Sequence, residues 1–491
     1  MAIMKNLLKN FCIALLIFSA GSISRAQSTQ DQCFVCHDSN GDKIAALYKT
    51  DVHFQKNIPC SGCHGGNFKT DDMDAAMNYK EGFLGVPKGD QISNRCIQCH
   101  GKAETMKRYG SNLPTNQYES LQNSVHWQKS TKGTEHIVQC ITCHNAHGIV
   151  SVKNSSSPVY SLNLPALCSK CHSNAVYMRS YNPSLPIDQF QKYKSSVHGM
   201  RNINGDAKAA DCADCHGTHE IRKAADVKSK VYPINIPQTC STCHSNVEYM
   251  KTYKIATDQF SKYKSSVHGK ALFEKNDLNA PTCNSCHGNH AATPPGVESI
   301  SKVCGNCHVL NAELFSASPH KKAFDKRKYP ECETCHKYHD IVTASNELLG
   351  VSKETVCGKC HSAAENKKGF EIAKKMRNLI DNLESEITAA KSMVEEAEQK
   401  GMEVSDAKFK LRDANQARLE SRTMVHSIDY QKFEEIVSRK GLQATTRVKE
   451  EARSAIDNYF FRRYGLLVSV IIMSMLAFAL FLYIKNIERK K

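Results

Sequence analysis

Cysteine and histidine recur in one fixed arrangement along most of this chain. The pattern Cys-x-x-Cys-His occurs eleven times and uses 22 of the 23 cysteines. Two thiols followed directly by an imidazole are typical of covalent haem c attachment, in which the cysteines form thioether bonds to the porphyrin and the histidine binds the iron. The paired cysteines are Cys33 and Cys36, Cys60 and Cys63, Cys96 and Cys99, Cys140 and Cys143, Cys168 and Cys171, Cys212 and Cys215, Cys240 and Cys243, Cys283 and Cys286, Cys304 and Cys307, Cys332 and Cys335, and Cys357 and Cys360. The histidines that complete the motifs are His37, His64, His100, His144, His172, His216, His244, His287, His308, His336 and His361.

Three other uses of paired cysteines compete with haem attachment: zinc ribbons, redox dithiols and disulfide frameworks. None of them requires a histidine directly after each pair. Histidine makes up only 22 of the 491 residues, so its presence after all eleven pairs favours the haem interpretation. We therefore expect eleven covalently bound c-type haems.

The first 26 residues have the features of a secretory signal peptide. Lys5 and Lys9 precede an apolar run, and a small-residue cleavage site ends at Ala26. Cys12, the one cysteine outside the motifs, lies in the apolar run and would be lost with the signal. Haem is attached to such motifs outside the cytoplasm, so we expect the mature haem region, from residue 27 onward, in the periplasm.

The motifs belong to an internal repeat. The segments NQYESLQNSVH, DQFQKYKSSVH and DQFSKYKSSVH are followed by CHNAH, CHGTH and CHGNH, and a second motif closes each copy. A shorter fourth copy has ASPH and CHKYH, and an abbreviated copy that precedes these four has TDVH and CHGG. One haem at Cys33 followed by five two-haem copies accounts for the eleven. We divide this part into a three-haem region, residues 27–102, and an eight-haem region, residues 103–361.

The haem regions have little sequence for each haem. Residues 33–361 provide about 30 residues for each motif, which is too few for an ordinary side-chain core. The mean hydropathy is −0.47 and the chain has a single tryptophan. We expect the haems themselves to form the apolar interior, in a mostly α-helical and irregular fold with short helices, long loops and almost no sheet.

A second class of histidine also follows the repeat, and we predict that its members bind the other face of the irons. His216 and His219 are only three residues apart, whereas axial ligands lie on opposite faces of a porphyrin, so these two must serve different haems. Neighbouring haems are linked in this way. The repeated second histidines are His53, His126, His198, His268 and His320 before a motif, and His147, His219, His290 and His339 after one.

Nine second histidines leave two haems without one. Only His136 and His426 remain, so we predict both as ligands, although each could instead be an exposed histidine. Methionine is the alternative axial ligand, but the repeated methionine position holds Leu314 in the fourth copy, which favours packing. The repeated methionines are Met106, Met178 and Met250.

The composition changes after His361. Residues 362–460 contain no cysteine or proline, and their apolar residues have the spacing of a coiled-coil seam. Gly401 is a typical helix end and Ser405 a typical helix start, so we predict an antiparallel helical hairpin with a break or bend at Gly441. The seam residues are Met376, Ile380, Leu383, Ile387, Ala390, Val394 and Ala397.

Residues 465–484 contain no charge and are long enough to span a bilayer. Residues 485–491 form a more basic flank than the two arginines before the span, so the positive-inside rule places the C-terminus in the cytoplasm. A buried core helix is the alternative. We predict a single-pass protein of the cytoplasmic membrane, with the haem domain in the periplasm and membrane lipid around the C-terminal helix.

The formal net charge is +16, and removal of Lys5, Lys9 and Arg25 with the signal lowers it to +13. A basic protein can bind nucleic acid. Eleven haems, however, carry up to 22 propionates, which would bring the net charge of the mature protein to about −9. The basic residues are better explained as propionate partners, so we expect no nucleic-acid binding.

With SSVHG followed by CADCHGTH and CSTCH, residues 33–361 resemble the periplasmic multihaem c-type cytochromes, a group that includes low-potential tetrahaem carriers, quinol-linked cytochromes and octahaem oxidoreductases. The helical segment after the last haem is similar to the C-terminal helices of the hydroxylamine oxidoreductase and nitrite reductase group. Nitrite reductases of that group have lysine in place of histidine at the catalytic haem, whereas every motif here ends in histidine.

Two functions fit this sequence. The first, which we favour, is an electron conduit with low-potential irons that each hold two histidines, linking a quinol-oxidising membrane subunit to periplasmic electron carriers. The membrane segment has no histidine to bind haem b, so a partner must oxidise the quinol. The second is an oxidoreductase that acts on nitrite, hydroxylamine or tetrathionate at one open haem. No residue is assigned a catalytic role.

Overall fold

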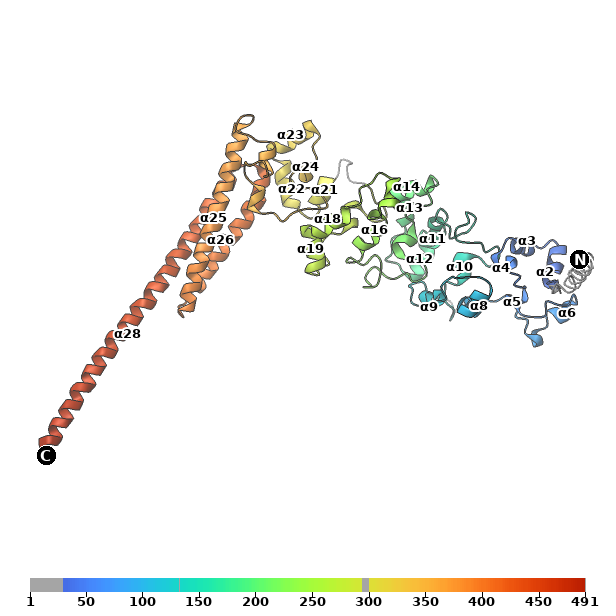
Figure 1. The fold of residues 1–491 in the computed structure, drawn as a ribbon, viewed down its shortest axis with the longest axis horizontal. Helices are drawn as coiled ribbons and strands as arrows, with labels where there is room; N and C mark the ends of the chain where they lie inside the picture. Colours follow the sequence, from blue (N-terminus) through green and yellow to red (C-terminus); the bar gives the residue numbers. More distant parts are fainter. Residues whose placement is uncertain (1–29, 132, 294–299, 491) are drawn as a thin grey trace, which may run out of the picture. The chain divides into compact units, whose positions relative to one another are not determined.

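The computed structural model describes residues 30–131, 133–293 and 300–490. The predicted signal peptide and Cys12 lie outside these residues. Within them the chain is helical or irregular, and the pairing of Lys129 with His136 is an isolated β-bridge rather than part of a strand. The prediction of a mostly α-helical and irregular fold is confirmed (Figure 1).

The haem regions consist of short helices joined by turns and loops. In the first part of the chain these are α2 (Gln32–Ser39), α3 (Lys43–Lys49), α4 (Val52–Gln55), α5 (Ser61–His64), α6 (Met73–Ala76), η1 (Tyr79–Glu81), α7 (Asp90–His100), α8 (Ala103–Arg108), α9 (Gln117–Gln122), α10 (Cys140–His144), α11 (Leu164–His172), α12 (Ala175–Tyr181), α13 (Gln189–Ser195), α14 (Val197–Ile203) and α15 (Cys212–His216). They continue as α16 (Ile236–His244), α17 (Val247–Lys251), α18 (Gln259–Ser265), α19 (Val267–Glu274), α20 (Cys283–His287), α21 (Ile300–Gly305), α22 (Val309–Ser316), α23 (Pro319–Arg327), α24 (Glu331–His336), η2 (Asn346–Leu348) and η3 (Cys357–Lys359).

The chain divides into two compact units. The first ends at Asn235 and also includes His290–Ala292. The second comprises Ile236–Asn289 and everything from Thr293 onward. The first unit therefore holds motifs one to six and the second holds motifs seven to eleven.

The repeated Ser-Val-His-Gly sequence has a local structural reason. Ser266 caps α19 by accepting a hydrogen bond from the backbone N–H of Gly269 at 3.0 Å, and Ser196 caps α14 through Gly199 at 2.9 Å. A Cβ on Gly269 would lie 2.0 Å from the carbonyl oxygen of Tyr263, so no larger residue fits there. The serine and glycine thus fix the start of the helix on which the histidine lies.

Consecutive repeats are joined by a recurring backbone hydrogen bond. The donor is the N–H of the valine directly before the histidine that precedes the first motif of a copy. The acceptor is a carbonyl oxygen in the following copy, two residues after the histidine that follows the first motif there. The bonds are Val52 to Ile149 at 2.8 Å, Val125 to Ile221 at 2.8 Å, Val197 to Ala292 at 3.0 Å and Val267 to Ile341 at 2.8 Å. The fourth copy has Pro319 at this position, a residue with no N–H to donate. The four copies before it are therefore each bonded to residues of the copy that follows.

The C-terminal region begins with α25 (Lys367–Gln399), whose predicted apolar seam is buried at all seven positions. Gly401, at φ 76°, ends this pass in the left-handed conformation that glycine favours. α26 (Ser405–Met424) then returns antiparallel to α25, as expected. Ala407, near the start of α26, packs with the end of α25, and Ala414, further along α26, packs with the first half of α25.

The structure differs from the predicted two-helix hairpin, because the chain turns a second time. After η4 (Val425–Ser427), Ile428 is left-handed at φ 53°, and the chain continues as α27 (Tyr430–Glu434), the π-helix η5 (Glu435–Leu442) and α28 (Gln443–Lys490). α28 packs against both α25 and α26. The region is a three-helix bundle, and Gly441 lies within the π-helix rather than at a break.

α28 continues without interruption into the apolar segment, well past the ends of α25 and α26 (Figure 1). The helical stretch Tyr430–Lys490 contains a window of mean hydropathy 2.6, none of which is buried. By length and composition this helix could cross a membrane.

Candidate haem-binding site

The structure brings histidines together in pairs, each joining a motif histidine to a second histidine. In nine pairs the ring centroids are 5.8–6.3 Å apart. The pairs are His100 with His53, His64 with His147, His172 with His126, His144 with His219, His216 with His290, His308 with His268, His287 with His339, His361 with His320, and His336 with His426.

This spacing fits an iron ion with an imidazole on either side. Two iron–nitrogen bonds of about 2 Å, with about 1 Å from each nitrogen to its ring centre, add up to about 6 Å. Nearly parallel rings that stack directly are much closer, since the rings of Trp127 and His136, with 14° between their planes, are 3.7 Å apart. None of the motif cysteines among the described residues is in a disulfide, so both cysteines of each motif are available for thioether bonds to the porphyrin. These residues therefore fit a covalently attached haem, which would supply an iron that accepts and releases one electron.

Eight of the nine pairs follow two rules. Motifs three, five, nine and eleven take the second histidine from earlier in the chain, as His172 does with His126. Motifs two, four, six and eight take it from the following copy, as His144 does with His219. The neighbours His216 and His219 thus belong to different pairs, as the sequence requires. His244 and His198 occupy the positions in their copy that His172 and His126 occupy in the preceding one.

Burial keeps several of these imidazoles in the neutral form that binds metal. Burial, together with the nearby His172, lowers the pKa of His126 to about 4. Burial likewise lowers the pKa of His144 and of His216. At neutral pH a ring nitrogen of each is therefore free of its proton and can donate a lone pair to iron.

Several pairs also have a fixed ring orientation. The Nδ1 of His64 lies 2.9 Å from the carbonyl oxygen of Gly85, and that of His287 lies 3.2 Å from the carbonyl oxygen of Thr293. A carbonyl oxygen only accepts, so Nδ1 carries the proton and Nε2 is left for the metal.

Contacts between cysteines connect successive motifs. The first cysteines of motifs three and four, five and six, seven and eight, and nine and ten lie close together. These neighbours are Cys96 and Cys140, Cys168 and Cys212, Cys240 and Cys283, and Cys304 and Cys332. The second cysteine of an even motif then lies near the following motif: Cys63 near Cys99, Cys143 near Cys168, Cys286 near Cys304, and Cys335 near Cys357. Within each unit, neighbouring motifs in sequence are therefore neighbours in space.

His426 lies in the turn between α26 and α27 rather than on an exposed helix face. Its ring is 6.0 Å from that of His336, and its Nδ1 is 2.9 Å from the carbonyl oxygen of Thr423. The bundle also contacts motif eleven, through Gly369 near the start of α25. A Cβ added to Gly369 would lie 2.2 Å from the ring of His361. The bundle thus packs against motifs ten and eleven.

His136 lies elsewhere, stacked on the chain's single tryptophan. The ring of His136 is 3.7 Å from that of Trp127, with 14° between the planes, and its Nδ1 lies 2.9 Å from a carboxylate oxygen of Asp90. Trp127 occupies the position that Gly199 and Gly269 hold in the later copies, and the chain does not continue there as a helix. The structure does not bring His136 to a motif histidine.

His37 is the other histidine outside the pairs. Its Nδ1 lies 3.0 Å from a carboxylate oxygen of Asp42, and its side chain is 59% exposed. All 22 histidines are among the described residues, and no other histidine ring there lies against that of His37. The repeated methionines Met106, Met178 and Met250 are 7%, 7% and 4% exposed, as expected of packing residues.

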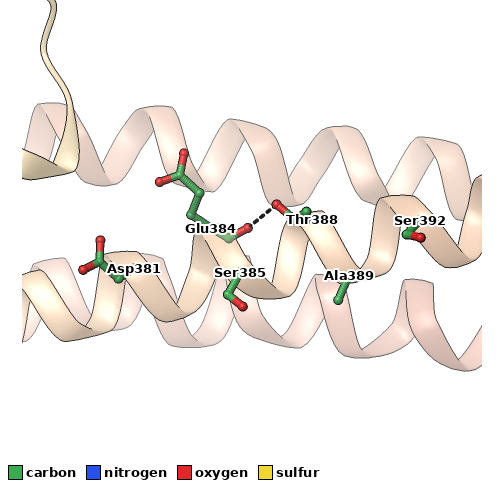
Figure 2. A pocket seen from close by; sticks show the side chains of 6 residues that line it. All are labelled: Asp381, Glu384, Ser385, Thr388, Ala389 and Ser392. Atoms are coloured by element: carbon green, nitrogen blue, oxygen red, sulfur yellow. Dashed lines mark hydrogen bonds between the residues drawn. The ribbon is translucent and has the colours of Figure 1, made fainter.

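A shallow hollow on α25 contains no histidine or cysteine. Asp381, Glu384, Ser385, Thr388, Ala389 and Ser392 line it (Figure 2). The side-chain amide of Asn346 donates to Asp381 at 3.1 Å and to Glu384 at 2.6 Å. These carboxylates hold the loop after motif ten against the bundle.

Comparison with known proteins gives two family matches and a curated relative. The family described as Cytochrome c3 matches residues 52–173 and 204–309, and the family described as Cytochrome c554 and c-prime matches residues 303–387. The C-type polyheme cytochrome OmcC of Geobacter sulfurreducens is 21% identical over 303 residues, which are 53% of this chain and 37% of that relative. The chain thus aligns with little more than a third of the relative's length. No solved structure matches it.

Proposed function

We propose that this multihaem c-type cytochrome conducts electrons through eleven covalently bound haems, ten of which hold their iron between two histidines. Its class follows from the two cytochrome families that together match most of residues 52–387, and from its polyhaem relative. Electron transport is the function that this class implies. The count of eleven is supported by the motifs, each of which supplies two thiols and a histidine.

The ligands of ten irons are assigned from the histidine pairs. Nine motif histidines have a second imidazole at about the distance that two iron–nitrogen bonds require, at 5.8–6.3 Å between centroids. From the repeat in the sequence alone, we also assign His244 and His198, which hold the repeat positions of His172 and His126. His426 is included, whereas His136 is not, because its ring face is covered by Trp127 and its Nδ1 is bonded to Asp90. Two imidazoles fill both axial positions and favour a low-potential carrier over a site for substrate.

The single observation that supports conduction most strongly is the order of the cysteine contacts. Electron transfer slows steeply as the distance between haems grows, so a conductor needs each haem beside the next. Cys96 contacts Cys140, Cys143 lies near Cys168, and Cys168 contacts Cys212, which links motifs three to six in sequence order. Motifs seven to eleven are linked in the same way.

The anchor and the partners belong to the same proposal. We infer that α28 crosses the cytoplasmic membrane through residues 465–484, with the basic tail in the cytoplasm and the haem domain in the periplasm. The support is the helix's unburied apolar window and the attachment of c-type haem outside the cytoplasm. A membrane subunit that oxidises quinol would supply the electrons, and periplasmic carriers would receive them.

The experiment removes one haem from the series of neighbouring motifs. Cys168→Ala with Cys171→Ala removes haem five from the middle, and Cys357→Ala with Cys360→Ala removes the terminal haem eleven as a matched control. After flash reduction of the purified proteins, the haems of the middle variant should become reduced in two separate phases. The haems of the control and of the unaltered chain should become reduced in a single phase. Unchanged kinetics in the middle variant would contradict conduction along the row.

A further inference from the structure

We propose that the first haem, held by Cys33, Cys36 and His37, keeps one axial position of its iron open to a small uncharged ligand. This inference rests on the proposed function, because it uses the same pairing of imidazoles. The first motif is the one to which that pairing assigns no second histidine.

The histidines account for every motif except the first. Nine motif histidines have a partner ring, and His244 has His198 at the equivalent repeat position. Besides His37, this leaves only His136, which stacks on Trp127 at 3.7 Å and lies 2.9 Å from Asp90. Of the motif histidines among the described residues, only His37 and His308 are exposed, and His308 lies 6.3 Å from His268.

The surroundings of His37 also make its imidazole a strong electron-pair donor to iron. Its Nδ1 donates to the carboxylate of Asp42 at 3.0 Å, which fixes Nε2 as the metal-binding atom. A carboxylate partner raises the basicity of a ligating imidazole, as it does at zinc sites. Among the motif histidines, His64 and His287 differ, since their Nδ1 atoms face neutral carbonyl oxygens. A carboxylate also contacts Nδ1 of His53, a second histidine, at 2.8 Å. The hydrogen bond to the ligating histidine is one of the features by which a protein tunes a haem iron.

The charge around this motif selects the class of ligand. Residues 31–51 contain two lysines and four aspartates, and one lysine, Lys49, is paired with Asp38 at 2.7 Å. Asp31 accepts hydrogen bonds from the backbone N–H groups of Cys33 and Cys60, so its carboxylate lies between motifs one and two. The haem propionates add further negative charge. An anion such as nitrite is disfavoured in this surrounding, whereas an uncharged ligand such as carbon monoxide or nitric oxide is not.

Carbon monoxide is the probe for this site. The dithionite-reduced, full-length protein in detergent should bind one carbon monoxide per chain, and the oxidised protein should contain one high-spin haem by electron paramagnetic resonance. If all eleven haems are low-spin and no carbon monoxide binds, this inference is wrong while the paired-histidine row stands. If several haems bind it, the proposed function itself fails.

Two variants locate the site. Cys33→Ala with Cys36→Ala should reduce carbon monoxide binding from one per chain to none, whereas the matched control, Cys96→Ala with Cys99→Ala, should leave one per chain. Asp42→Asn provides a test that does not require removal of a haem. It should shift the infrared C–O stretch of the bound ligand, because it weakens the imidazole donor on the opposite face of the haem. The control is Asp51→Asn, which removes the carboxylate 2.8 Å from Nδ1 of His53 and should leave the stretch unchanged. A stretch that is unchanged by Asp42→Asn, or carbon monoxide retained after loss of Cys33 and Cys36, would overturn the assignment.

Discussion

The imidazole of His426 lies 6.0 Å from that of His336, with the planes 22° apart. His336 ends the tenth motif, and His426 lies in a turn of the C-terminal bundle. Earlier even motifs obtain the second histidine from the following copy of the repeat, and after the tenth motif no further copy follows in the chain. The bundle takes over the role of that copy.

Replacement of His426 should leave one additional haem iron with a free coordination position. In His426→Ala we expect the haem of Cys332 and Cys335 to become high-spin and the carbon monoxide bound per chain to increase by one, because a second imidazole is lost. Ser427→Ala, in the same turn, is the control and should leave both quantities unchanged. An unaltered spin state in His426→Ala would show that the bundle provides no ligand.

His136 should have a structural role only. We expect His136→Ala to leave the number of low-spin haems unchanged and to lower stability by about 1–3 kcal/mol, because it removes a ring stack and a charge-assisted hydrogen bond. Thermal unfolding, followed beside the haem spectrum, separates these effects. His136→Phe keeps the stack on Trp127 and should recover part of the stability. A new high-spin haem in either variant would identify His136 as a ligand.

The hydrogen bond between repeats can be removed at Val267 without loss of the helix. Val267 is the first residue of α19, where proline is well tolerated, and the extended Ser266 before it, at ψ 164°, suits a following proline. Val267→Pro should therefore keep α19 but lose the bond to Ile341, at a cost of about 1 kcal/mol. Val267→Ala controls for the side chain. The proline variant should melt below the alanine variant, and equal melting temperatures would show that the bond contributes nothing.

Truncation should separate the anchor from the haem array. A chain that ends after residue 464 keeps the bundle contacts of α28, since its buried residues Thr445, Val448 and Ala452 all precede that point. We expect this chain to appear in the soluble periplasmic fraction with an unchanged haem content, whereas the full chain stays with the membrane. Membrane association of the truncated chain would mean that another surface binds the bilayer.

Much of this architecture could be predicted from local patterns. The motifs, the repeat and the α25 seam depend on short spacings within the sequence, and all seven seam residues are buried. Gly401 marked the first turn of the bundle correctly, because the left-handed conformation of a glycine acts locally. α26 does begin at Ser405, but Val404 is its N-cap residue and no side chain caps it by a hydrogen bond.

The second turn was missed because its main signal is unusual. Ile428 is left-handed at φ 53°, a conformation that β-branched residues rarely adopt, and neither glycine nor proline marks the place. Asp429 was an available clue, since its side chain accepts hydrogen bonds from the N–H groups of Gln431 and Lys432 and starts α27. Without this turn, His426 was expected on the long second helix of the hairpin rather than in the short η4 at the turn.

The pairing of histidines could not be read from one sequence, because it depends on contacts between copies. Counting alone assigned His136 and His426 equally to the two incomplete haems. The structure distinguishes them, since it brings His426 to His336 but places His136 on Trp127. The substitution of Trp127 for the repeated glycine was the local signal that this copy departs from the others.

Structure determination of the haem-loaded protein tests the central claim most directly. Our account predicts eleven haems, with an iron midway between the imidazoles of each of the nine pairs, including His336 with His426, and with a single histidine on the iron at His37. Irons bound on one side only at several of these pairs, or haems separated from their sequence neighbours within a unit, would contradict it.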